Sequence, residues 1–102
     1  MDVTLLYFQG CPNWEVADAR LRLLAAERPD LTVTRRLVET AAEADRVGFF
    51  GSPSIQVDGV DGVDVFAGPG SQVGMACRRY LTPDGVAGAP TLDQLRAVLT
   101  GA

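Results

Sequence analysis

The sequence predicts an α/β fold with a four-stranded mixed sheet, in the order strand, helix, strand, helix, strand, strand, helix. Three observations support this: an apolar run opens the chain, segments with helical spacing alternate with β-prone segments, and Asp-Gly turn sequences separate the later ones. A strand–helix–strand start implies a parallel pair joined by a right-handed crossover, and the two later strands close the sheet as a hairpin with helices on both faces. At 102 residues, we expect one domain, 1–102.

The first strand covers Val3 to Phe8, an almost unbroken apolar run bounded by Gln9 and Gly10. Such a run is typical of a central strand buried on both faces. Its end, Leu6 to Gly10, also looks like the scar of a cleavable expression tag. Because the residues before it take part in the strand pattern, we treat the segment as native.

A helix and a second strand follow. Apolar residues at helical spacing predict a helix that begins at Cys11–Pro12 and ends before Pro29, with these residues on one face: Trp14, Ala17, Leu21, Leu24 and Ala25. Asp18 and Arg22 form an i,i+4 pair outside that face. The range Leu31 to Val38 alternates and is rich in β-branched residues, which predicts the second strand.

Turn and capping residues place the remaining elements. Capping boxes at Thr40–Glu43 and Thr91–Gln94 predict a helix from Ala41 to Val47, stopped by Gly48, and a final helix. The third strand is predicted at Ser54 to Asp58, after Pro53, and the fourth at Met75 to Thr82. We expect most of the range from Gly59 to Gly74 to be loop.

Charge and hydropathy exclude several classes of partner. The net charge is −4 and the basic residues are nine scattered arginines, which argues against nucleic-acid binding. No apolar run approaches ~18 residues and no secretory signal opens the sequence, so we expect a cytoplasmic protein with no membrane partner. All of the basic residues are arginines, and Ala, Gly and Val are abundant. This composition is typical of a bacterium with a GC-rich genome.

The cysteines are the candidates for covalent chemistry. The chain has two of them, Cys11 and Cys77, and no histidine, which excludes Cys-His and Ser-His-Asp catalysis and any His-based metal site. Without an export signal, free thiols are expected in preference to a structural disulfide. Cys11 lies at the carboxyl end of the first strand, where ligands of α/β sheets collect. The following helix dipole favours a thiolate, so we expect the pKa of Cys11 below the free value of ~8.5.

The segments "GCPNW", "GSPSIQVDG" and "CRRY" resemble the thioredoxin-like family in its glutaredoxin-sized form. More narrowly, they are similar to small bacterial members, some of them labelled as related to organomercurial lyases. The resemblance implies that Cys11 is the nucleophile, Pro12 starts the helix and Pro53 is a cis-proline. It also implies that Ser52 offers backbone hydrogen bonds to a bound partner. Trp14 departs from the family, because it stands where the resolving cysteine would be.

Tryptophan cannot clear a mixed disulfide, so two routes remain. In the first, Cys11 is a monothiol, resolved by glutathione, by another low-molecular-weight thiol or by a protein thiol. In the second, Cys77 approaches Cys11. The predicted hairpin places Cys77 at the far end from Pro53, as a buried strand residue, and so disfavours the second route.

Three functions fit these residues. The first is a thioredoxin-like protein with a single reactive thiol at Cys11, acting in thiol–disulfide exchange or thiol-dependent detoxification as a monothiol oxidoreductase. The second is an organomercury or soft-metal thiolate protein that uses Cys11 and Cys77, which requires the two sulfurs within roughly 4 Å of each other. The third is a non-catalytic binding module that recognises a peptide beside Pro53. For the first function we expect substrate contacts at Pro12, Trp14, Ser52 and Pro53, and no resident metal or cofactor.

Overall fold

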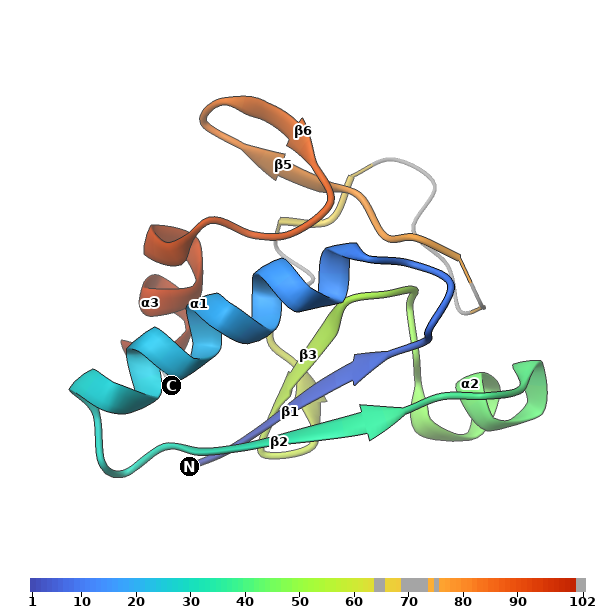
Figure 1. Ribbon diagram of the computed structural model, residues 1–102, viewed down its shortest axis with the longest axis horizontal. Helices are drawn as coiled ribbons and strands as arrows, with labels where there is room; N and C mark the ends of the chain where they lie inside the picture. Colours follow the sequence, from blue (N-terminus) through green and yellow to red (C-terminus); the bar gives the residue numbers. More distant parts are fainter. Residues whose placement is uncertain (64–65, 69–73, 75, 101–102) are drawn as a thin grey trace.

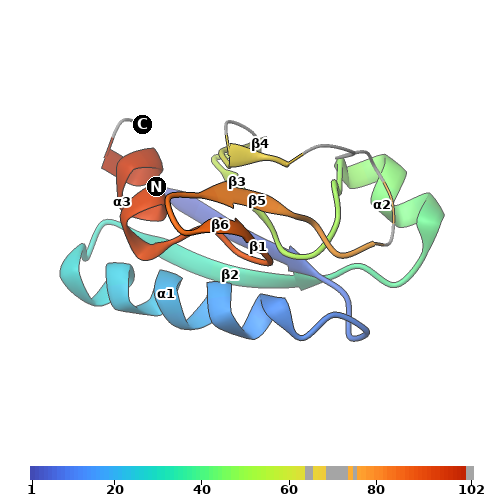
Figure 2. The same ribbon diagram turned by 90° about the horizontal axis from the view of Figure 1, so that it is seen from above.

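The computed structural model describes residues 1–63, 66–68, 74 and 76–100. Its elements in chain order are β1 (Asp2–Tyr7), α1 (Asn13–Glu27), β2 (Thr32–Leu37), α2 (Ala41–Val47), β3 (Ser54–Val57), β4 (Val60–Asp61), β5 (Tyr80–Thr82), β6 (Gly85–Ala87) and α3 (Leu92–Thr100). A four-stranded mixed sheet has the order β2-β1-β3-β4, and β5 and β6 form a separate two-stranded sheet (Figures 1 and 2). The pair β1–β2 is parallel, as predicted, and the other pairs are antiparallel.

The strand β1 lies in the interior of the sheet and is buried on both faces. Leu5 packs in a core cluster with residues of α1 and α3, whereas the next residue, Leu6, packs against Ala44 of α2. Both leucines have no exposed surface. The prediction of helices on both faces is therefore confirmed: α1 and α3 cover one face, and α2 lies on the other, beyond the carboxyl end of β2 (Figure 1).

The local signals in the sequence place the helix ends. The Thr40 hydroxyl accepts a hydrogen bond from the Glu43 amide at 3.1 Å, and Gly48 ends α2 in the left-handed region with φ 72°. The second capping box forms in both directions, with Thr91 N to Gln94 Oε1 at 3.0 Å and Gln94 N to Thr91 Oγ1 at 3.1 Å. Capping thus fixes where these two helices begin.

The fourth strand is not where the sequence analysis placed it. The chain turns at Asp58 and Gly59, whose φ angles are 51° and 87°, and returns at once as β4 along β3. Positive φ at both central residues is the geometry of a tight hairpin turn. The edge of β3 is therefore occupied by β4, and Tyr80–Thr82 pairs instead with β6 through the turn at Pro83–Asp84. Met75, the first residue of the strand predicted there, and much of the predicted loop lie outside the described residues.

None of the helices within the described ranges is long and apolar enough to cross a lipid bilayer.

Candidate functional site

Cys11 lies in the short connection between β1 and α1. Its backbone amide donates to the Phe8 carbonyl at 3.4 Å, and Pro12 occupies the N-cap position with φ −73° before α1 begins at Asn13. Pro12 itself is exposed, whereas Cys11 has no exposed surface. Both residues therefore lie where the sequence predicts them, after the carboxyl end of β1 and at the start of a helix.

Cys11 is joined by a disulfide to Cys77, with 6.0 Å between the two Cα atoms. That separation is within the usual range for a disulfide, roughly 4.4–6.8 Å. The finding corrects two expectations: the cysteines are not free thiols, and Cys77 does not lie far from Pro53. Nor is Cys77 a buried strand residue, because its side chain is exposed while that of Cys11 is buried.

Cys77 reaches this position because its segment runs beside the chain that precedes β3. Between the described residues of the two stretches, three backbone hydrogen bonds form: Gly74 N to Phe49 O at 3.0 Å, Ser52 N to Ala76 O at 2.8 Å, and Arg78 N to Ser52 O at 2.9 Å. Ser52 and Cys77 are thereby paired in a parallel bridge. The parallel pairing replaces the antiparallel hairpin predicted from the sequence, and this is why Cys77 lies beside Pro53 and not far from it.

Gly51 makes this close approach possible. A Cβ atom at Gly51 would lie 2.7 Å from the Ala76 carbonyl oxygen and 3.2 Å from the Cβ of Arg78. Its φ of 103° also lies in the region that side chains rarely adopt. Only glycine allows the two backbones to lie this close.

The Ser52–Pro53 peptide bond is cis, as the resemblance implied. The backbone amide and carbonyl of Ser52, expected to bind a partner, are both bonded to the chain's own segment around Cys77. The Ser52 carbonyl oxygen also lies 3.6 Å from the Sγ atom of Cys11. The hydroxyl of Ser52 is buried and has no hydrogen-bond partner among the described residues. Ser52 therefore acts through its backbone.

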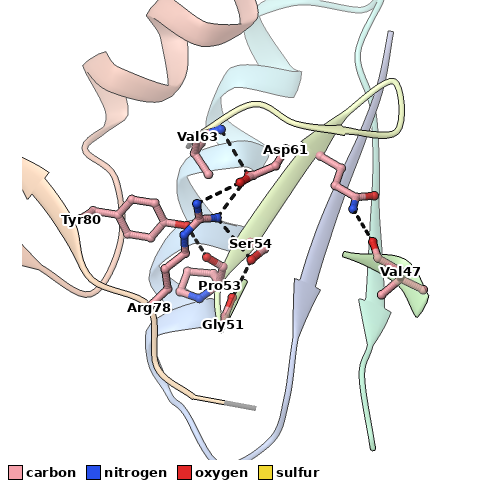
Figure 3. Close-up of polar contacts among 9 residues, drawn as sticks. Val47, Gly51, Pro53, Ser54, Asp61, Val63, Arg78 and Tyr80 are labelled. Carbon is pink, nitrogen blue, oxygen red and sulfur yellow. Dashed lines mark hydrogen bonds and ion pairs between the residues drawn. The ribbon is translucent and has the colours of Figure 1, made fainter. Parts of the chain in front are cut away.

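The residue after Cys77, Arg78, carries a fully buried guanidinium group (Figure 3). It donates to Asp61 at 3.2 and 2.9 Å and to the Ser54 hydroxyl at 3.4 Å, and it lies 5.4 Å from the ring of Phe50. It also lies 5.2 Å from the ring of Tyr80, whose hydroxyl donates to the Pro53 carbonyl. The Arg78 cluster, made of these residues, thus connects the Cys77 segment to the cis-proline and to β4.

Charge in this cluster is stabilised by pairing. Burial by itself lowers the pKa of Arg78, but the hydrogen bonds to Asp61 and the neighbouring Tyr80 outweigh it, so the pKa lies above its ordinary value. Burial also raises the pKa of Tyr80 well above its ordinary value. Arg78 therefore stays charged and Tyr80 neutral throughout the physiological pH range.

Trp14 faces a different set of neighbours. Its ring stacks on Tyr7 with centroids 4.3 Å apart, and the Arg35 guanidinium lies 5.3 Å from its centroid. It also packs against the core cluster beneath α1. These contacts explain a tryptophan at this position by packing between β1, β2 and α1.

Four residues of the site were not identified from sequence: Gly51, Asp61, Arg78 and Tyr80. Asp61 lies in the range from Gly59 to Gly74, which was expected to be mostly loop, and "CRRY" contains two adjacent arginines of which one is buried and the other exposed. The spacing of two between Arg78 and Tyr80 was the signal that could have identified them as buried neighbours, since alternate residues of an extended segment lie on the same face.

Comparisons of the chain with protein-family models, with curated proteins and with solved structures give no match. Within the described part of the chain, no group of three or more Cys, Asp or Glu residues is arranged to hold a metal ion.

Proposed function

We propose that this chain is a thioredoxin-like protein that carries out thiol–disulfide exchange with Cys11 and Cys77 as its redox pair. The observation that carries the proposal is the disulfide between a buried cysteine at a helix start and an exposed cysteine paired to the residue before a cis-proline. A mixed sheet with a parallel β1–β2 crossover and helices on both faces is consistent with the fold that the resemblance implies.

The difference in exposure predicts which sulfur exchanges first. An incoming thiolate must approach along the S–S axis, and Cys11 has no exposed surface, so attack falls on the Sγ atom of Cys77. Cys11 then leaves as a thiolate beside the first amides of α1, where an anion is favoured. After protonation its thiol can donate to the Ser52 carbonyl oxygen, 3.6 Å away.

The return reaction uses the same atoms. The Cys11 thiolate attacks the mixed disulfide held on Cys77, reforms the internal bond and releases the partner thiol. Cys11 thereby takes the resolving role that the resemblance gives to a cysteine at position 14, and Cys77 takes the role of the exchanging nucleophile that it gives to Cys11. The external partner is glutathione, another low-molecular-weight thiol, or a protein thiol. In this proposal only variants that lack one of the two cysteines would react by the monothiol route, in which the mixed disulfide waits for an external thiol.

Equilibration with glutathione followed by mass spectrometry tests this function. We expect the wild type to show the internal disulfide and little glutathione adduct, because the second thiol is close enough to expel glutathione. Cys11→Ser should keep one persistent adduct on Cys77, since the resolving thiol is gone. If the wild type instead accumulates a glutathione adduct and no internal disulfide, the two-cysteine function is wrong and the monothiol function replaces it.

A second function, soft-metal binding by the reduced pair, is favoured by the same juxtaposition of sulfurs. Thiolates prefer soft cations, and two adjacent thiolates suit an ion that accepts two ligands. We expect reduced wild type to bind one Cu(I) or one organomercurial tightly enough to block reoxidation by glutathione. Equal binding by Cys77→Ser would show that the pair is not the site.

A further inference from the structure

Backbone contacts that do not depend on the disulfide hold the segment of Cys77 in place. The hydrogen bonds from Ser52 N to Ala76 O and from Arg78 N to Ser52 O flank Cys77 on both sides. Neither bond involves a sulfur atom, so reduction of the disulfide removes neither the donor nor the acceptor of either bond.

The side chain of Arg78 adds an anchor directly after Cys77. Its side chain has no exposed surface and is bonded to Asp61 and to the Ser54 hydroxyl (Figure 3). The rings of Phe50 and Tyr80 lie 5.4 and 5.2 Å from the guanidinium. A guanidinium bound in this way leaves its site only by separating a buried ion pair, which is costly. The neighbouring Arg79 is exposed.

We propose that Arg78 is a positioning residue for the redox pair and keeps Cys77 beside Cys11 after the disulfide has been reduced. The inference rests on the exchange function proposed above. A thiol held by a flexible tether meets its partner at an effective concentration in the range of roughly 1 mM, whereas a fixed geometry raises this by orders of magnitude. The anchor thus lets two cysteines 66 positions apart act as one dithiol.

The reaction that measures this is the oxidation of the pair by oxidised glutathione. A thiolate of Cys77 attacks one glutathione sulfur and expels the first glutathione, and the thiolate of Cys11 then attacks Sγ of Cys77 and expels the second. One protein disulfide forms, one glutathione disulfide is reduced by two electrons, and the two protein thiol protons end on two glutathione thiols. The equilibrium constant has units of concentration and is the effective concentration of the pair.

This constant should be measured for the wild type, Arg78→Met, Asp61→Asn and the matched control Arg79→Met, with near-ultraviolet circular dichroism to verify that each reduced form is folded. Arg79→Met should stay within about twofold of the wild type, as surface substitutions do. Arg78→Met should lower the effective concentration by at least about tenfold, because only the backbone bonds then hold Cys77. Asp61→Asn should shift it in the same direction by less.

The possible outcomes separate the alternatives. A merely structural role for Arg78 would move the unfolding midpoint of the variants but leave the glutathione equilibrium of the folded protein equal to that of Arg79→Met, and this would overturn the proposal. Should reduced Arg78→Met not fold, Asp61→Asn decides in the same way. A wild type that forms no internal disulfide at all would refute the exchange function itself, irrespective of the variants.

Discussion

Two clusters in this molecule contain the same chemical groups: an arginine paired with an aspartate beside an aromatic ring. In one, Arg35 donates to Asp18 at 3.0 and 2.7 Å and lies over Trp14. In the other, Arg78 donates to Asp61 at 3.2 and 2.9 Å and lies near Phe50 and Tyr80. The arginine side chain is 41% exposed in the first cluster and fully buried in the second.

The difference in burial decides what each cluster does. Water competes for the charges of Arg35, so that pair contributes little to holding β2 against α1. Arg78 is out of water and has its charge compensated by Asp61, so moving it costs far more. In the cluster around Trp14 the arginine is partly in water and the aspartate is buried, whereas in the cluster beside Cys77 the arginine is fully buried. We therefore expect the second cluster to hold its segment more firmly.

The largest expected difference between the clusters is in stability. Arg78→Met should destabilise the oxidised protein by about 3–5 kcal/mol, because Asp61 loses its partner in a nearly buried site. The same substitution at Arg35 should cost only a small fraction of this, because the Arg35 side chain is 41% exposed and Asp18 keeps its ion pair with Arg22. Urea unfolding of both variants, with the disulfide intact, measures the difference. Equal losses would mean that burial does not distinguish the two clusters.

A smaller effect on stability is expected at Gly51, where the backbone passes close to the Ala76 carbonyl beside the buried cluster. Gly51→Ala and Gly59→Ala both place alanine at positive φ, which costs roughly 1–2 kcal/mol. Gly51→Ala also forces the Ala76 carbonyl away, which should add roughly 1–3 kcal/mol. At Gly59, apart from its chain neighbours, no described residue has an atom within 4 Å of the new methyl group.

Thermal unfolding of the two glycine variants gives the comparison. The glutathione equilibrium of Gly51→Ala should also fall relative to Gly59→Ala, since the displaced segment carries Cys77. If the two variants behave alike, the close contact at Gly51 is not needed to position the pair.

The smallest expected effect is the pH dependence of stability that comes from Asp18, the partner of Arg35. Burial by itself raises the pKa of Asp18, but hydrogen bonds from Arg35 and Arg22 outweigh it and hold the pKa below the ordinary value of 3.8. A depressed pKa stabilises the fold at pH values above 3.8, and this contribution is lost as the pH falls through the pKa of the folded state. Asp18→Asn should therefore unfold at a lower temperature than the wild type at pH 7, and the gap should narrow at pH 3.

The sequence predicted the elements whose signals are local. The strand through Leu5 and Leu6, the cap at Thr40 and the turn at Gly48 all depend on residues within a few positions of one another. The Asp58–Gly59 turn between Val57 and Val60 was a local hairpin signal as well, but it was assigned to a loop, and β4 was missed for that reason.

The position of Cys77 could not be obtained in the same way. It depends on pairing between Ser52 and a segment 25 positions later (77 − 52), and an extended segment can pair with any open edge. The choice between Arg78 and Arg79 as the buried residue follows from that pairing. The resemblance supplied Cys11 and the cis-proline, whereas the partner of Cys11 required the tertiary structure.

The disulfide is a second covalent connection between the two ends of the segment from Cys11 to Cys77. It joins positions 11 and 77, so a protease that cuts a single peptide bond between them leaves both fragments in one molecule. Such a nick stays invisible on a denaturing gel until a reductant is added. A cut beyond the bridge, for instance at the exposed turn of Pro83 and Asp84, releases the C-terminal fragment under the same conditions without reduction.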